Sequence, residues 1–314
     1  MGDSTVMATF DLQPIVSGLA SARQRWRMAQ QRSTEPGGRE LPSRDELSKI
    51  VEALRGALFP MRLGPPDLRQ ESEDYYVGHT LDTLLHALLH QVRLELHYND
   101  RHEGSKTAPA VLDAQALRIV GEFGHALPEI RTLLDSDVMA AFEGDPAARS
   151  VDEVLLAYPG IEAMIHHRVA HRLYALGVPL LARLVAELAH GKTGIDIHPG
   201  ASIGPGFFID HGTGVVIGET AVIGQRVRVY QAVTLGAKSF PTDDQGHPIK
   251  GQPRHPTVQD DVVIYAGATV LGRVTIGRGA SIGGNVWVTH DVPAGAQVTQ
   301  ARSRKEALMD GGWL

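Results

Sequence analysis

Apolar or small residues recur every six positions in the C-terminal part of the chain, and this period limits the possible folds more than any other feature. An α-helix would place such residues three and four apart, and an ordinary strand would alternate them in twos. A period of six that persists over many repeats is typical of a hexapeptide parallel β-helix, whose short flat faces stack coil upon coil. The first column is Ile197, Ile203, Ile209, Ile217, Ile223, Val229, Leu235, Val258, Ile264, Val270, Ile276, Ile282 and Val288.

A companion column lies four residues after the first. Glycine often follows a first-column residue, as at Gly204, Gly218 and Gly277, where the chain must turn tightly between faces and a Cβ would be strained. A β-sandwich is the alternative fold, but its turn signals would come at irregular spacings of about eight to twelve residues, and that pattern is absent. The companion column is Ala201, Phe207, Thr213, Ala221, Val227, Val233, Val262, Ala268, Val274, Ala280 and Val286.

Composition excludes several functional classes. With 314 residues, of which 43% are hydrophobic and 21% charged, the chain can bury a sizeable core and is expected to form two domains. The formal net charge of -6 argues against nucleic acid as a partner. Without cysteine, disulfides, a thiol nucleophile and cysteine-ligated zinc are excluded. No leader-like start and no apolar run of about eighteen residues is found, so we expect a cytoplasmic protein with no membrane partner.

The segments of the chain differ in composition and spacing, and the predicted fold class is α+β. Residues 1–40 are polar and end in a Pro/Gly-rich stretch, which predicts a flexible or weakly structured arm. Helical spacing over 41–192 predicts an α-helical domain. We expect a left-handed parallel β-helix of hexapeptide repeats over 193–292, with a protruding loop at 237–256, and then a C-terminal tail at 293–314.

The residues after Ile209 break the period, because two extra residues precede the next column position, and they include Asp210 and His211. His211 is therefore expected on an irregular turn, where a neutral imidazole can take a proton from a hydroxyl group near pH 7. Asp196, almost one coil earlier, is a candidate carboxylate for orienting this ring. A histidine on a turn is also commonly a plain surface residue, and taken alone that interpretation is favoured.

Arg254 and His255 in the predicted loop add to the case for a small-molecule site. A guanidinium group matches a carboxylate with two parallel hydrogen bonds, so Arg254 could hold an amino acid or hydroxy acid. Asp145 could accept an ammonium group, although a helix-capping or turn role is the more common one for such an aspartate.

Two histidine pairs have the i,i+4 spacing of zinc ligands, namely His86 with His90 and His167 with His171. Neither pair has the intervening glutamate of a metalloprotease motif in the required place. We therefore interpret all four as packed or solvated helix residues and expect no metal cofactor.

Several longer motifs are more specific than the six-residue period. They are DPAARSVDEVLLAYPGIEA, HRVAHRLY, GIDIHPGASIGPGFFIDHGTGVVIGETAVIG, QAVTLGA and RHPTVQDDVVIYAGATVLG. Across about residues 145–292 the chain resembles the serine O-acetyltransferases of cysteine biosynthesis, and its longer loop before RHP resembles the branch of that family with an insertion there. The resemblance implies acetyl transfer from acetyl-CoA to the hydroxyl group of L-serine, giving O-acetyl-L-serine and CoA.

The resemblance also implies a role for each matching residue. His211 would be the general base and Asp196 its orienting carboxylate. Asp145 and Asp210 would meet the serine ammonium group, and Arg254 would bind the serine carboxylate.

Further contacts follow from the same motifs. His255 would lie close to the reacting hydroxyl. Backbone amides around Ala237, Ala266 and Gly267 would lie along the pantetheine arm of acetyl-CoA, in a groove between coils.

The family resemblance extends to partners. It implies a homotrimer with sites between subunits, often paired into a dimer of trimers through the helical domain, and feedback inhibition by L-cysteine. Many members insert a C-terminal tail ending in Ile into cysteine synthase, whereas this chain ends in Leu314.

Three other functions stay open at this point. A hexapeptide acyltransferase acting on homoserine or a sugar would share the fold, and one methylene is worth only about 1–3 kcal/mol of discrimination. A γ-type carbonic anhydrase needs three converging histidines, and only His211 and His255 are suitably placed. A non-catalytic partner of cysteine synthase would not need His211 and Asp196 together.

Overall fold

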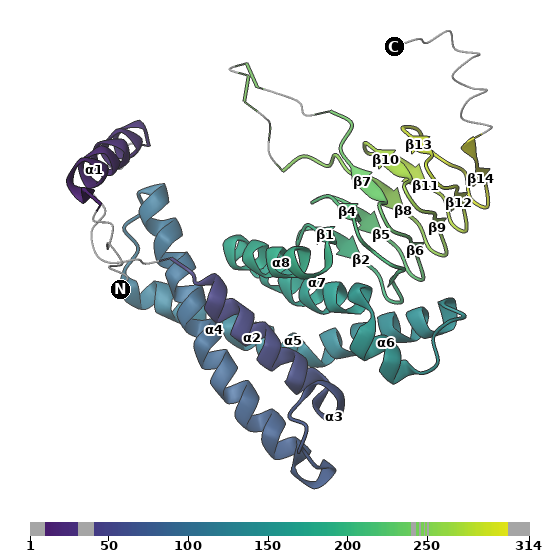
Figure 1. Ribbon diagram of the computed structural model, residues 1–314, viewed down its shortest axis with the longest axis horizontal. Coiled ribbons are helices and arrows are strands. Elements are labelled where there is room, and N and C mark those ends of the chain that lie inside the picture. Colours follow the sequence, from purple (N-terminus) through teal and green to yellow (C-terminus); the bar gives the residue numbers. More distant parts are fainter. Residues whose placement is uncertain are drawn as a thin grey trace, which may run out of the picture. The chain divides into compact units, whose positions relative to one another are not determined.

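The computed structural model describes residues 10–30, 41–239, 243–244, 246–247, 249 and 251–300 (Figure 1). The chain divides into two compact units, with the boundary between Glu40 and Leu41. Among the described residues, no helix has both the length and the apolar character needed to cross a membrane.

The first unit contains helix α1 (Leu12–Ala29). Asp11 caps it by accepting a hydrogen bond from the Gln13 N–H at 3.3 Å, and none of its residues is buried. The sequence predicts a flexible or weakly structured arm over residues 1–40, whereas residues 12–29 form a helix. Its apolar side chains recur three and four positions apart behind an aspartate cap, which favours a helix.

The second unit begins with a group of packed helices (Figure 1). Their shared core is formed by leucine, isoleucine and valine side chains that are almost fully buried. The helices are α2 (Arg44–Leu58), α3 (Pro60–Leu63), the 3-10 helix η1 (Gln70–Ser72), α4 (Glu73–Glu103), α5 (Pro109–Gly144), α6 (Val151–Ala157), α7 (Pro159–Ala175) and α8 (Pro179–Thr193).

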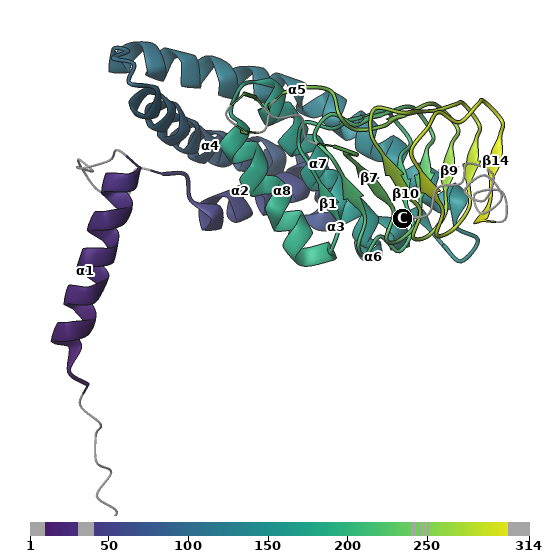
Figure 2. The ribbon, with the colours of Figure 1, turned by 90° about the horizontal axis from the view of Figure 1, so that it is seen from above.

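Short strands follow α8 and wind into a left-handed parallel β-helix, which Figure 2 shows with its coils stacked. The strands are β1 (Asp196–Ile197), β2 (Ser202–Ile203), β3 (Phe208–Ile209), β4 (Val216–Ile217), β5 (Val222–Ile223), β6 (Arg228–Val229), β7 (Thr234–Gly236), β8 (Thr257–Val258), β9 (Val263–Ile264), β10 (Thr269–Leu271), β11 (Thr275–Ile276), β12 (Ser281–Ile282), β13 (Trp287–Val288) and β14 (Gln297–Val298).

Each of the first four coils contributes one strand to each of three parallel sheets, and the last coil adds β13 to sheet A and β14 to sheet C. Sheet A has the order β1-β4-β7-β10-β13, sheet B has β11-β8-β5-β2, and sheet C has β14-β12-β9-β6-β3. Equivalent column residues pair in register along each sheet, as Ile197 does with Ile217 and Ile217 with Leu235. The six-residue period therefore predicted the fold, and the observed register follows the same columns.

The first column is buried at every position, so the core of the β-helix is the one that the sequence predicts. One companion residue is an exception. Thr213 is exposed, and Val215 is fully buried in its place. The two extra residues before Ile217 cause this shift, since they move the inward-facing position two residues along the chain.

The far end of the β-helix extends beyond the predicted boundary at residue 292. Strand β14 pairs with β12 in sheet C, and Val292 forms a bridge with Ile276. Val298 comes six residues after Val292, so the period continues into the predicted tail at 293–314. Residues 301–314 lie outside the described part of the chain.

A buried ion pair ties the helices to the first coil. Arg168 on α7 bonds Asp137 on α5 at 2.9 Å, and both side chains are almost fully buried. Arg168 also donates to the carbonyl oxygens of Ile203 and Gly204, while Asp137 accepts the Phe207 N–H at 2.9 Å. These bonds satisfy both charges, which is the condition under which such a pair is tolerated in a core.

Candidate active site

His211 lies in the turn between sheets C and A, where the two extra residues enter the first coil. Its φ of 61° is left-handed, and Gly212 and Gly214 beside it also have positive φ. The backbone of this turn thus directs the imidazole outward, and the side chain is 71% exposed. The sequence prediction that His211 lies on an irregular turn is confirmed. We call residues 210–214 the first corner.

Asp210 is the buried neighbour of this imidazole. Its Oδ2 accepts a 2.6 Å bond from Arg228 on β6, and its Oδ1 lies 3.7 Å from His211 Nδ1. Arg228 also donates to the Gly144 carbonyl at 2.6 Å, and its guanidinium lies 4.7 Å from the centre of the Phe208 ring. Arg228 therefore fixes Asp210 in one orientation and links it to the end of α5.

Asp145 follows α5 and stands beside the first corner. Its Oδ2 accepts a 2.5 Å bond from the Tyr158 hydroxyl, and its Oδ1 accepts the Ala147 N–H at 2.8 Å. The Tyr158 bond is the main cause of the lowered pKa of Asp145, with smaller contributions from the charges of Arg228 and His211. The same bond raises the pKa of Tyr158 to about 12. Asp145 is thus a carboxylate kept ionised close to the exposed imidazole.

Arg254 and His255 lie at the turn between sheets A and B, where the long connection returns to the coil. Arg254 forms a 2.6 Å ion pair with Glu219, and Glu219 also accepts a 2.9 Å bond from the Tyr174 hydroxyl. The Arg254 side chain is 24% exposed, so part of its donor set faces solvent. We call residues 218–220 together with 254–255 the second corner.

His255 is buried, unlike His211. Its Nδ1 lies 3.0 Å from the Thr220 N and accepts that N–H, which places the ring proton on Nε2. A Cβ on Gly218 would lie 2.1 Å from His255 Nε2, so only glycine leaves room for the ring. Burial is the main cause that lowers the pKa of His255 to about 4, and the charge of Arg254 adds to it. The imidazole is consequently neutral and a donor at neutral pH.

The two corners flank sheet A, one before its strands and the other after them. His211 and Arg254 of one chain lie on opposite sides of sheet A, and no hydrogen bond or ion pair among the described residues joins the two corners. The structure brings Asp145, Asp210 and His211 together in one group and Arg254 and His255 in another.

The residues predicted to contact the pantetheine arm are divided in the same way. Ala266 and Gly267 precede β10 on the side of the first corner, and Ala237 follows β7 on the side of the second. The Gly267 N–H donates to the Gln231 carbonyl at 3.0 Å and is thus committed within the coil. Gly267 has a φ of 72°, and a Cβ there would meet Asn285 at 2.2 Å. Gly267 can therefore leave room for the pantetheine arm to approach the backbone, but its N–H is not available to bind that arm.

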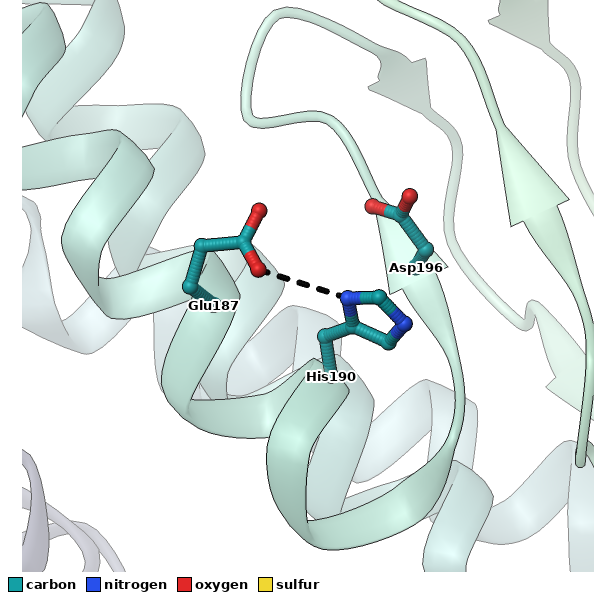
Figure 3. Close-up of side chains that lie close together, drawn as sticks. All are labelled: Glu187, His190 and Asp196. Carbon is teal, nitrogen blue, oxygen red and sulfur yellow. Dashed lines mark hydrogen bonds and ion pairs between the residues drawn. The ribbon is translucent and has the colours of Figure 1, made fainter.

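Asp196 is at the start of β1, and no hydrogen bond or ion pair joins it to His211 among the described residues. Ligand-type atoms of Asp196, Glu187 and His190 instead lie within 4.8 Å of one another. Figure 3 shows these side chains facing a common space, with Glu187 and His190 on α8. Sequence reasoning missed this neighbourhood, although the i,i+3 pair at the end of a helix just before Asp196 was a signal for it.

Known proteins with similar sequences identify the family. Residues 255–290 match the family described as bacterial transferase hexapeptide (six repeats). The plasmid serine acetyltransferase of Synechococcus elongatus is 59% identical over 275 residues, which are 87% of this chain and 86% of that protein. The chain belongs to the serine acetyltransferase family.

Solved structures of serine acetyltransferases share the fold. Serine acetyltransferase 1 of Entamoeba histolytica, in complex with L-cysteine, is 39% identical with a TM-score of 0.68, over 79% of this chain and 85% of that one. A serine acetyltransferase in complex with CoA is 27% identical with a TM-score of 0.50, over 80% of this chain and 95% of that one. The resemblance drawn from the motifs is confirmed.

Four further residues hold the predicted site residues in place, and sequence reasoning did not single them out. Tyr158 and Arg228 hold the two carboxylates of the first corner, and Glu219 and Thr220 hold the two basic residues of the second. Each is a polar side chain next to an otherwise apolar repeat or helix, but their partners lie far away in sequence. Only the fold brings them together.

Proposed function

We propose that this protein transfers the acetyl group of acetyl-CoA to the hydroxyl of L-serine, with His211 as the general base. The observation that carries the proposal is the first corner, where a left-handed turn displays an exposed imidazole beside two carboxylates. Membership of the serine acetyltransferase family supports the choice of serine and acetyl-CoA.

In the proposed reaction, a neutral ring nitrogen of His211 takes the proton from the serine hydroxyl as that oxygen attacks the thioester carbonyl carbon. The tetrahedral intermediate then expels the CoA sulfur, and the imidazolium returns the proton to that thiolate. Asp196 would orient His211 in this step, after its carboxylate turns from α8 towards the first corner. No covalent acyl-enzyme and no metal cofactor take part.

The serine molecule would be bound at both ends. Asp145 and Asp210 suit its ammonium, because each carboxylate oxygen can accept a second hydrogen bond besides those that it already accepts. Arg254 would bind the serine carboxylate with the donors that Glu219 leaves free. His255, with its proton on Nε2, would donate to an oxygen close to the reacting centre.

Because the corners of one chain lie on opposite sides of sheet A, we propose that each site combines the first corner of one copy with the second corner of another. A homotrimer with its β-helices side by side would bring three such pairs together, either alone or as a dimer of trimers. Ala266 and Gly267 of one copy would then line the acetyl-CoA groove opposite Ala237 of its neighbour.

Regulation and location complete the proposal. L-cysteine has the ammonium and carboxylate groups of serine and would occupy the same contacts as a feedback inhibitor, which the cysteine complex of the Entamoeba relative supports. Cysteine synthase is proposed as a partner through the C-terminal tail, whose last residues up to Leu314 lie outside the described part. We place the enzyme in the cytoplasm, at the first step of cysteine biosynthesis from serine.

The function is tested by measuring CoA release from acetyl-CoA with L-serine, L-homoserine, a galactoside or no acceptor. Release that depends on L-serine and that L-cysteine suppresses is the expected result. Greater release with L-homoserine would show that homoserine is the substrate in place of serine. The proposed contacts to the ammonium and carboxylate groups would be the same for both. No release with any acceptor would overturn the enzymatic assignment in favour of a non-catalytic partner of cysteine synthase.

A further inference from the structure

A cluster of three side chains that can act as metal ligands lies where α8 passes into β1. Its members are Glu187, His190 and Asp196. One possible ligand atom of each lies within 4.8 Å of those of the other two. Glu187 and His190 share one face of α8 because they are three residues apart, and Asp196 approaches from the first strand (Figure 3). The cluster therefore joins two elements across one small space.

We propose that these three residues bind a divalent transition-metal ion such as Zn²⁺, and that the bound ion inhibits the enzyme by holding Asp196 away from His211. One imidazole with two carboxylates suits zinc, whereas Mg²⁺ and Ca²⁺ prefer six or more oxygen ligands. Binding itself stands on the geometry of the cluster. Its inhibitory effect rests on the proposed function of Asp196.

The cluster can close on an ion with small side-chain movements. Zinc bonds of about 2.0–2.2 Å place ligand atoms roughly 3.3–3.6 Å apart in a tetrahedron. Atoms that now lie up to 4.8 Å apart therefore need to approach by at most about 1.5 Å. The side chains of His190 and Glu187 are 45% and 35% exposed, which leaves them free to move and admits a hydrated ion. Asp196 is held more firmly, since its N–H bonds the Val215 carbonyl at 2.9 Å.

Two carboxylates around the cluster favour a cation, and the nearby guanidinium of Arg183 competes with it. Glu187 Oε2 lies 3.3 Å from His190 Nδ1, so carboxylate and imidazole already face each other. Glu187 Oε1 forms a 2.9 Å ion pair with Arg183 one turn earlier on α8. Arg183 therefore opposes the ion, and removing its charge should strengthen metal binding.

The cluster is coupled to the first corner through the backbone. The Gly214 N–H donates to the Gly194 carbonyl at 2.8 Å, and Asp196 comes two residues after Gly194. Asp196 therefore lies on a segment whose backbone is bonded to the turn that bears His211, and its own N–H donates to the Val215 carbonyl. A metal bond to Asp196 would keep it on the α8 side and leave the His211 imidazole without its orienting partner.

Binding is tested by titrating the full chain, without a histidine tag, with Zn²⁺ in a calorimeter. One ion per chain is expected. His190→Ala should weaken this binding by about 100-fold, since the loss of a residue that only contacts a metal ligand already lowers metal affinity by about 10–100-fold. Glu187→Gln should weaken it as well, and Arg183→Ala should strengthen it. His86→Ala is the matched control, because His86 also faces a carboxylate one turn earlier, Asp82 at 3.6 Å, but no third ligand joins this pair in the described part of the chain.

An absence of Zn²⁺ binding, or binding that His190→Ala leaves unchanged, would overturn the site. The inhibitory effect is measured separately as CoA release with L-serine. Zn²⁺ should lower turnover of the natural chain and of His86→Ala but not of His190→Ala. If Zn²⁺ binds as expected and turnover is unchanged, the inhibitory effect is wrong. If no variant acetylates L-serine even without metal, the proposed function fails, while the calorimetric result on the site still stands.

Discussion

The two corners of sheet A place one histidine each, but in opposite environments. His211 sits on a left-handed turn with its side chain 71% exposed, and one of its ring nitrogens faces Asp210. His255 is buried, fixed by Thr220 and packed against Gly218. An exposed imidazole beside a carboxylate can meet a bound hydroxyl group and take its proton, whereas a buried neutral one can only donate from a fixed position. The difference assigns proton transfer to the first corner and positioning to the second.

The largest expected effect comes from removing the base. His211→Ala should lower kcat by about 10²–10⁴-fold, the usual contribution of a general base. Because the side chain is exposed, the free energy of unfolding and the affinity for acetyl-CoA should stay close to those of the natural chain. Steady-state kinetics together with acetyl-CoA binding separates these effects. Near-normal turnover would contradict the assignment of proton transfer to the first corner.

Arg254→Ala should act mainly on serine binding. Hydrogen bonds to a charged group contribute about 1.5–3 kcal/mol, so KM for L-serine should rise by about 10–100-fold with a smaller change in kcat. Arg226→Ala is a suitable control, because that exposed arginine pairs with Asp261 away from both corners. A loss confined to kcat would show that Arg254 acts in the chemical step and not in serine binding.

Thr220→Val should loosen the second corner. The Thr220 hydroxyl accepts the N–H groups of Arg254 at 2.9 Å and His255 at 3.1 Å. Two partly buried donors would lose their acceptor, which typically costs about 1–3 kcal/mol of stability. Thr220→Ser keeps the hydroxyl and should restore both stability and activity. Chemical denaturation of the two variants measures the difference, and equal stability would contradict the role of the hydroxyl.

The smallest effect concerns pH. Burial and Arg254 hold the pKa of His255 at about 4, so this imidazole is neutral above that pH and does not change charge between pH 5 and 8. His255→Asn should therefore lower kcat without moving the acid limb of the kcat/KM profile. A limb that shifts or disappears in this variant would show that His255 titrates in the working range, and the contrast between the corners would fail.

The regular parts of this molecule could be predicted from sequence, and the irregular parts only in outline. The six-residue period predicted which residues form the core of the β-helix, since every first-column residue is buried. The same period failed at Thr213, where two extra residues moved the inward position to Val215, and in the segment assigned to the tail, where β14 continues the coil. Local insertions shift a periodic pattern, and a single sequence does not say by how much.

Site residues followed a similar rule. The motifs pointed to His211 and Arg254, because an interrupted repeat and a loop motif are visible in the sequence itself. The partners that hold the site residues were not visible. Tyr158 reaches Asp145 and Glu219 reaches Arg254 only through the folded helices and coils. The proximity of Asp196 to α8 rather than to His211 was likewise a property of the three-dimensional arrangement.

The most direct test of the account is complementation between two variants, His211→Ala and Arg254→Ala, which are coexpressed with different tags and purified as mixed oligomers. Activity is measured at L-serine well below the KM of the natural chain, where each variant alone turns over slowly. Each chain then carries one damaged corner, and an intact site can form only between two different chains. In a randomly mixed trimer about a quarter of the sites combine two intact corners, so about a quarter of the natural activity should return. Activity no higher than that of either variant alone would contradict a site shared between copies.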